Sequence, residues 1–437
     1  MKAGLKYRDR TKQTDVDEFD FAARSAPFSR TETLANFTRF VPQNTRLPLY
    51  NAFPVLDELD PFLNRLRSQA AGLSSVLVNS NREDFESSEK VLAGYVMGVL
   101  EPTDGMRIIT GARLERTKFR SDGNFVFDSD GSALPDATIA NPAVSNEFTD
   151  ILPTLLLRYE ATSELLLRGS FNMALQRPNF EDTRNVHSAL DDGTTRSLEL
   201  QNPLLDPAKA MQFDASVAWY PNRNTGLTFG VFYKRIRDFI VDADFLNVDI
   251  RNIPGVNIPL PAALPGGFVY NNVEVPVNGD VGKIWGAEFS YSQNFTFLPK
   301  PLNGLFAVVS ATWADSKANS SVRPGSFVFP GQPKWVVNGS LGYEDKGFSI
   351  RGAMTYRDKV LDSIASTPVL DRIRPAFTSF DIDVRFNITD AIQLYADAIN
   401  ITGEQDERYY RGDSNGGFFN QIERYGRTFQ LGVRASF

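Results

Sequence analysis

His187 is the only histidine of the sequence and therefore the first residue to consider for acid–base chemistry. A general base of this kind needs an oriented nucleophile and a carboxylate partner. His187 lies in a polar stretch that we interpret as a loop, and neither a G-x-S-x-G elbow nor a P-loop occurs in the chain. The sequence therefore predicts no catalytic residue, no enzyme activity and no bound cofactor.

Two aspartate-containing segments could begin loops that bind calcium through oxygen ligands: Asp128-Ser129-Asp130-Gly131 and Asp242-Ala243-Asp244. Neither has the glycine and distal glutamate spacing of an EF-hand, so solvated turns are favoured. The chain has no cysteine, which excludes a disulfide framework and a thiolate metal site. We therefore expect no metal site.

Two further motifs lie in polar segments. Arg411-Gly412-Asp413 spells an adhesion tripeptide, which we interpret as a coincidence of sequence. Gln176-Arg177-Pro178-Asn179-Phe180 follows directly on a strand-like run, and a structural role is favoured over direct contact with a solute. The residues that bind a ligand stay unknown at this level, because long loops carry specificity without a recognisable code.

The composition limits the class of protein. The chain has 437 residues, 42% of them hydrophobic, and a mean hydropathy of −0.26. No run approaches the roughly 18 apolar residues of a membrane-spanning helix. The formal net charge of −7 argues against nucleic acid as a partner, because phosphate binding needs a basic surface. The 34 Phe, 14 Tyr and 4 Trp supply the aromatic side chains that interfacial girdles would require.

The C-terminal segment shows the main structural pattern most clearly. From Tyr425 onward, mainly apolar residues alternate with mainly polar ones, which indicates a strand with two different faces. The final aromatic residue, Phe437, resembles the C-terminal signature of bacterial outer-membrane β-barrels. The odd, mainly apolar positions are Tyr425, Arg427, Phe429, Leu431, Val433, Ala435 and Phe437, and the even, mainly polar positions are Gly426, Thr428, Gln430, Gly432, Arg434 and Ser436.

The same pattern divides the whole chain into about fourteen strands. Six hairpins with short turns are predicted, and the first strand (2–10) and the last (421–437) have no hairpin partner. The paired ranges are 89–101 with 106–119, 151–160 with 164–175, 211–220 with 226–238, 282–295 with 304–317, 333–344 with 348–358, and 376–389 with 392–403.

Long polar loops separate these hairpins, at 11–88, 120–149, 176–210, 239–281, 318–332, 359–375 and 405–420. Short turns at one end and long loops at the other are typical of a transmembrane barrel, with the long loops extracellular. A β-sandwich spreads its loops over both ends. In the first loop, Asp60, Pro61, Leu63, Leu66 and Ala70 predict a short helix that packs the loop against the rim.

The predicted fold is thus all-β, an antiparallel up-and-down transmembrane β-barrel with neighbours in sequence paired in space. The alternation also predicts which way the side chains point. We expect an outward-facing set and a lumen-facing set. The first is Phe289, Tyr291, Ile382, Val384, Phe386, Phe429 and Leu431, and the second is Glu288, Arg351, Asp381, Asp383 and Arg385.

Three runs resemble TonB-dependent outer-membrane receptors, namely 152–186 (LPTLLLRYEATSELLLRGSFNMALQRPNFEDTRNV), 202–240 (NPLLDPAKAMQFDASVAWYPNRNTGLTFGVFYKRIRDFI) and the ending ADAINITGEQDERYY…YGRTFQLGVRASF. Their order is similar to that in the C-terminal part of the receptor barrel. The resemblance implies an energised importer of a siderophore, cobalamin, a saccharide or a similar scarce solute in the Gram-negative outer membrane. It also implies outer-membrane lipid, a small solute bound by extracellular loops, and the TonB protein as partners.

The chain departs from that family in extent. A complete receptor barrel has about 22 strands around a plug, and a signal peptide and a TonB box precede it. The N-terminus, MKAGLKYRDRTKQ, lacks the apolar core of a signal peptide, and 2–10 is typical of a strand from mid-barrel. We therefore expect 1–437 to be the C-terminal part of a receptor barrel, without plug and TonB box and inactive alone.

Two alternatives stay open in the sequence. One is a complete, passive fourteen-stranded outer-membrane channel or an outer-membrane enzyme, which would carry a signal peptide directly before Met1. The other is a soluble all-β adhesin, which would need no detergent.

Overall fold

The computed structural model describes residues 1–16, 80–129, 134–253, 255–365, 367–413 and 416–436. It also gives the backbone of four short strands, β2 (Phe19–Asp20), β3 (Thr38–Phe40), β4 (Ala52–Pro54) and β5 (Ser74–Ser75). The helix expected around Asp60 to Ala70 lies outside the described residues. None of the helices in the described part has the length and apolar character needed to cross a membrane.

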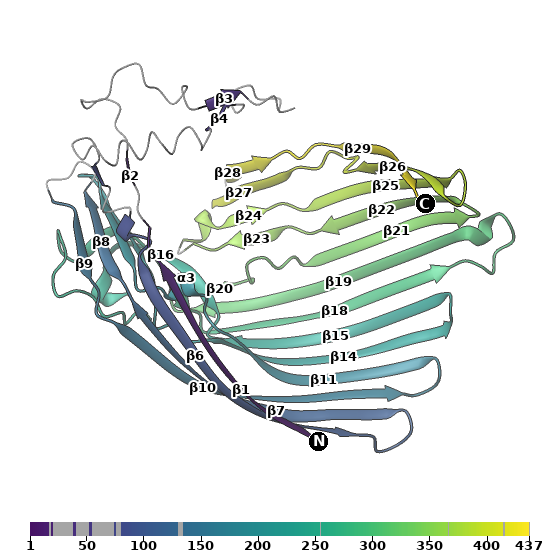
Figure 1. Cartoon of the computed structure of the whole chain (residues 1–437), viewed down its shortest axis with the longest axis horizontal. Helices are drawn as coiled ribbons and strands as arrows, with labels where there is room; N and C mark the ends of the chain where they lie inside the picture. The colour runs from purple at the N-terminus through teal and green to yellow at the C-terminus, as the bar shows by residue number, and fades with distance from the viewer. Residues whose placement is uncertain are drawn as a thin grey trace.

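One large curved sheet dominates the molecule (Figure 1). Fourteen strands follow one another in it in chain order, each antiparallel to the next, and β20 (Arg323–Phe327) extends it beside β19. This confirms the predicted all-β, up-and-down order. The fourteen strands, called the wall below, are β1 (Lys2–Thr14), β6 (Phe85–Leu100), β7 (Met106–Asp122), β10 (Val144–Glu160), β11 (Leu165–Gln176), β14 (Ala208–Asn222), β15 (Thr225–Arg237), β18 (Val281–Asn294), β19 (Leu305–Ser320), β21 (Trp335–Asp345), β22 (Phe348–Arg357), β25 (Phe377–Asn387), β26 (Ile392–Ile399) and β29 (Thr428–Ala435).

Short turns join the wall strands at one end of the sheet. One of the two-residue turns consists of Lys346 and Gly347, which both have positive φ, at 31° and 97°. Two such residues in a two-residue loop match the right-handed twist of the flanking strands. Glycine permits this conformation without a steric penalty, so the turn positions β22 directly beside β21.

Cross-strand register shows that the wall has two chemically different faces. Directly opposite residues of neighbouring strands lie on the same face. Ile350 pairs with Val384, Val384 with Ala396, and Ala396 with Leu431, which makes one apolar row over four strands. On the other face, Arg351 lies opposite Asp383. We call these the apolar face and the polar face.

Following the register from strand to strand extends the two faces over the whole wall. All residues expected to point outward lie on the apolar face, and all residues expected in the lumen lie on the polar face. The segregation of the two predicted sets is thereby confirmed.

Three of the expected loops contain strands that pair with one another. The ranges 120–149, 176–210 and 239–281 each contribute two strands to a six-stranded sheet, which we call the loop sheet. Its order is β16 (Ile240–Asp249), β17 (Val269–Asn278), β13 (Arg196–Leu200), β12 (His187–Asp191), β8 (Asn124–Ser129) and β9 (Ala137–Ala140). The hydrophobic core lies here and includes the fully buried Phe125, Tyr270 and Val273. These segments are therefore a folded layer and not irregular connections.

A second small sheet corrects the prediction for the C-terminus. β23 (Val360–Ser363), β24 (Arg372–Arg374), β27 (Asp406–Asp413) and β28 (Gly416–Glu423) pair in that order at the long-loop end of the wall (Figure 1). The expected single strand 421–437 is thus two strands, β28 and β29, in different sheets. Gly426, with φ of 70°, lies in the break between them. The wall strands also reach further than expected, since β6 already begins at Phe85.

The two faces generate a first prediction. The substitution Val384→Arg on the apolar face should lower the free energy of unfolding by about 2–4 kcal/mol if that position lies near the bilayer midplane. Arg385→Gln, one residue further on the polar face, should have a milder effect. The measurement is denaturant unfolding in phospholipid vesicles, and equal penalties at the two positions would show that the faces are assigned wrongly.

Candidate functional site

A cavity of about 610 Å³ lies at the long-loop end of the wall, where the loop sheet meets the strand ends. Five separate segments line it: the exit from β11 with the short helix α3 (Phe180–Thr183), Ala208 at the start of β14, the segment 236–242, the segment 329–330 and the segment 362–364. Its polar and aromatic lining includes Gln176, Arg177, Asn179, Asp182, Phe239, Asp242, Phe329 and Asp362. We call this space the mouth cavity.

Arg177 anchors the exit segment to the wall. It forms an ion pair with Glu115 on β7, and its Nε lies 3.8 Å from a carboxylate oxygen of Glu89 on β6. Glu89 also accepts hydrogen bonds from Arg8 and Arg10 of β1, at 2.8 and 2.7 Å. The two glutamates are nearly buried, and a buried carboxylate without a cation is costly. The contacts agree with the structural role expected for this motif.

Asn179 positions the next acidic group of the cavity. Its side-chain oxygen accepts a hydrogen bond from the backbone N–H of Asp182 at 2.8 Å, which caps the start of α3. Burial raises the pKa of Asp182, and repulsion from Asp242 and Glu181 raises it further. Within the described residues, neither Asp182 nor Asp242 takes part in an ion pair. The cavity therefore has uncompensated negative charge.

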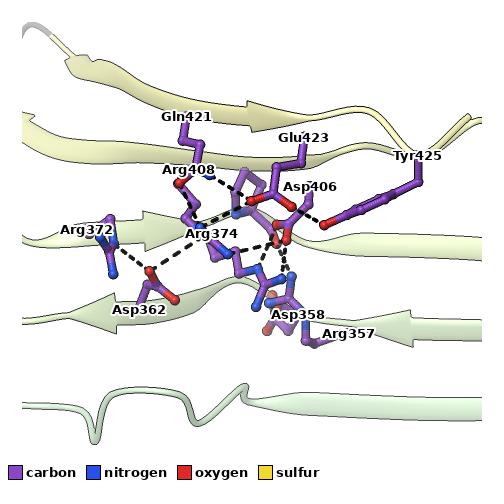
Figure 2. A network of polar contacts seen from close by, with 11 residues as sticks. Arg357, Asp358, Asp362, Arg372, Arg374, Asp406, Arg408, Gln421, Glu423 and Tyr425 are labelled. Carbon is purple, nitrogen blue, oxygen red and sulfur yellow. Dashed lines mark hydrogen bonds and ion pairs between the residues drawn. The ribbon is translucent and has the colours of Figure 1, made fainter. Parts of the chain in front are cut away.

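Asp362 belongs instead to an arginine–carboxylate network, which Figure 2 shows across β23, β24, β27 and β28. Its carboxylate accepts a hydrogen bond from Arg372 at 2.5 Å and lies 3.8 Å from Arg408. A two-pronged pair from Arg374 holds the pKa of Asp406 below its ordinary value. The charge of Asp362 is thus compensated, and the network stiffens one side of the mouth cavity.

Two phenyl rings complete the lining. Phe239 and Phe329 meet edge to face, with ring centroids 4.9 Å apart and an interplanar angle of 68°. Carboxylates beside aromatic surface can hold a solute through its hydrogen-bond donors or positive charge while its apolar part lies on the rings. The arrangement is therefore suited to binding a solute.

The structure corrects the interpretation of His187. It begins strand β12, and its side chain is fully buried in the core of the loop sheet rather than in a polar loop. Its Nδ1 accepts a hydrogen bond from the backbone N–H of Gln201 at 3.2 Å, and its ring lies edge-on to Phe125. Burial lowers the pKa of His187 to about 3, so the imidazole is neutral at physiological pH.

Where the structure describes them, the residues of the two calcium candidates lie in strands and not in the solvated turns that were expected. Asp128 lies in β8, and its carboxylate accepts a hydrogen bond from Arg82 at 2.9 Å, while Asp130 and Gly131 lie outside the described residues. Asp242 and Asp244 lie in the strand β16 and not in a turn. In the part of the chain that the structure describes, no group of three or more acidic or histidine side chains could hold a metal ion.

The adhesion-like tripeptide is part of a strand. Arg411, Gly412 and Asp413 end β27, and Arg411 forms an ion pair with Asp371 at 3.0 Å. Asp371 is fully buried and also accepts a bidentate pair from Arg323, at 2.6 and 2.9 Å. Arg411 thus has a structural partner.

Sequence reasoning missed most of the mouth cavity. Asp182, Phe239, Phe329 and Asp362 carry no local motif, and they come together only because separate loops fold against each other. Two segments singled out in the sequence contribute to it: the exit motif starting at Gln176, and Asp242, which was considered there for calcium.

Comparison with known proteins agrees with this architecture. The sequence matches the family described as TonB dependent receptor-like, beta-barrel, over residues 1–401. No curated protein shows a significant sequence match.

Several solved structures are similar in fold. The ferric-catecholate import receptor Fiu from K12 E. coli is 14% identical, with a TM-score of 0.55 over 84% of this chain and 47% of that chain. The copper transporter OprC is 16% identical, with a TM-score of 0.56 over 81% of this chain and 49% of that chain. The ferric yersiniabactin uptake receptor FyuA from Yersinia pestis is 14% identical, with a TM-score of 0.52 over 81% of this chain and 46% of that chain. The chain spans about half the length of these proteins.

Buried His187 generates a prediction about pH. Because its folded-state pKa of about 3 lies below the unfolded value of 6.5, the unfolded state binds the extra proton first as the pH falls. Stability that is present above pH 6.5 is therefore lost toward pH 3, at about 1.4 kcal/mol per pH unit. Amide hydrogen exchange of β12 and β13 at pH 7 and pH 4.5 measures this loss.

His187→Gln is the control, because it keeps a hydrogen-bond acceptor and removes the titration. The raised pKa values of Asp182, Asp244 and Glu274 act in the opposite direction, but they act in both proteins. A variant that loses as much protection as the wild type on acidification would contradict this role of His187.

Proposed function

Since the chain belongs to the TonB-dependent receptor β-barrel family, we propose that it forms part of an outer-membrane barrel that imports a scarce solute. The solute classes in question are siderophores, cobalamin, saccharides and similar compounds, and the energy comes from TonB. The location that follows is the outer membrane of a Gram-negative bacterium.

The observation that carries the proposal is the continuous apolar face of the wall. Its large side chains are open to the surroundings, with Leu431 84%, Ile151 64% and Leu341 61% exposed. An apolar surface of this extent on a water-soluble protein would drive association. In a bilayer it meets hydrocarbon, while the polar face lines an aqueous lumen.

The orientation follows from the two ends of the wall. We assign the short turns to the periplasmic side and the long loops, 11–88, 120–149, 176–210 and 239–281, to the extracellular side. The mouth cavity then opens where a solute arrives from outside. Its carboxylates and rings would make the first specific contacts.

The two outer strands of the wall support the view that 1–437 is the C-terminal part of a larger barrel. β1 pairs only with β6, and β29 pairs only with β26, so each has a free edge among the described residues. Unpaired backbone groups cost several kcal/mol each in lipid. In the working receptor we assign both edges to further barrel strands, and the plug and the TonB box to the remaining half.

The mouth cavity gives a prediction on uptake. In the complete receptor, the double change Asp182→Asn and Asp242→Asn should lower TonB-dependent uptake about tenfold or more, because each carboxylate makes a charge-assisted contact worth about 1.5–3 kcal/mol. Asp244→Asn is the matched control, since Asp244 lies on the same strand as Asp242, is partly buried and does not line the cavity. Equal losses in the two proteins would exclude the cavity as the binding site.

The free edges give a second prediction. The chain alone, expressed behind an added signal peptide, should show no heat-modifiable gel mobility and no uptake. A stable, heat-modifiable barrel that imports solute only when TonB is present would overturn the assignment to a larger barrel. Solute leakage without TonB would point to the passive channel instead.

A further inference from the structure

Three arginines stand in line on the polar face, near the short-turn end of the wall. Arg158 of β10 lies directly opposite Arg107 of β7 and directly opposite Arg168 of β11. Directly opposite residues have Cβ atoms about 4.5–5.5 Å apart, and like charges in such pairs destabilise a sheet. We call these residues the arginine row.

Neighbouring carboxylates compensate the arginine row only in part. Arg158 forms an ion pair with Glu160, and Arg107 lies 3.8 Å from Glu101. Both glutamates are exposed, at 47% and 68%, so water screens these pairs. Within the described residues, Arg168 forms no ion pair. The row therefore retains positive charge.

A hollow of about 410 Å³ lies over the row. Besides the three arginines, its lining includes the apolar side chains of Ile109 and Leu156, the small polar residues Ser170 and Ser216 of β11 and β14, and one acid, Asp214. Ser170 donates a hydrogen bond to Asp214 at 2.9 Å, which occupies part of that carboxylate. The short side chains next to Arg168 leave room for a ligand of several heavy atoms.

We propose that this hollow is a binding site for a multiply charged oxyanion, such as a phosphate or a polycarboxylate. A guanidinium group presents parallel N–H donors that match the oxygens of these anions, and three such groups on adjacent strands can hold one anion together. A bound anion offsets the repulsion between the three positive charges of the row, and this gain does not depend on which solute the barrel transports. Only its place on the path through the lumen rests on the proposed function.

The site can be tested without transport. β7, β10 and β11 each pair on both sides, so the row does not depend on the free edges of the wall. The full chain in detergent micelles, with strand content checked by circular dichroism, is titrated with inorganic phosphate and, separately, with citrate by calorimetry at constant ionic strength. We expect saturable binding of at least one of them. Arg168→Gln should weaken it about tenfold or more, and the double variant R158Q/R168Q should abolish it.

Arg385→Gln is the matched control. Arg385 lies on the same face, is 50% exposed against 48% for Arg158, and also has a carboxylate two residues away on its own strand. It should leave the affinity unchanged. The proposal is overturned if neither anion binds saturably, or if R385Q weakens binding as much as R168Q, since binding would then reflect the general charge of the polar face. Neither result would bear on solute uptake at the mouth cavity.

Discussion

Unbroken backbone pairing between consecutive wall strands is the constraint on which the other features depend. In lipid, a strand must direct its backbone groups to its neighbours, because hydrocarbon offers no partner. The same pairing sets the register, and a slip of one residue would move every side chain of a strand to the other face. The only irregularity between consecutive wall strands in the described residues lies at Trp219–Asn222, beside a short turn. The wall can therefore keep two chemically different faces although it is a single layer.

The wall and the loop sheet meet different physical demands. The wall has little core of its own, because it is a single layer with lipid on its apolar face and water on its polar face. The loop sheet buries Phe125, Tyr270 and Val273 in a core of the kind found in water-soluble domains. Between the two parts, Arg177 directly follows β11 and fixes the start of the connecting segment to the wall through its ion pair with Glu115 of β7.

The sequence was sufficient to predict the wall and insufficient for the mouth. Alternation within each strand and the short turns are local signals, so the strand order and the faces around Val384 followed from them. The loop sheet depends instead on non-local pairing: β12 lies parallel to β8, from a different loop on the far side of β10 and β11. A strand of five residues such as His187–Asp191 is too short for its period to be recognised, which is why His187 was assigned to a polar loop. Asp182 and Asp242 likewise meet only through folding.

In β10, a single strand register determines both which side chains face the membrane and which charged side chains face the lumen. Leu157 lies on the apolar face, and Arg158, the next residue, lies in the arginine row. The register that exposes Leu157 to lipid is the register that places Arg158 between Arg107 and Arg168. A one-residue slip would put Arg158 into hydrocarbon and Leu157 into the lumen. The free-energy cost of placing a charged side chain in lipid disfavours this slip, and the register with the arginine row is therefore kept. Charged groups on the polar face are thus held in place by the insertion of their apolar neighbours, without needing a packed core behind them.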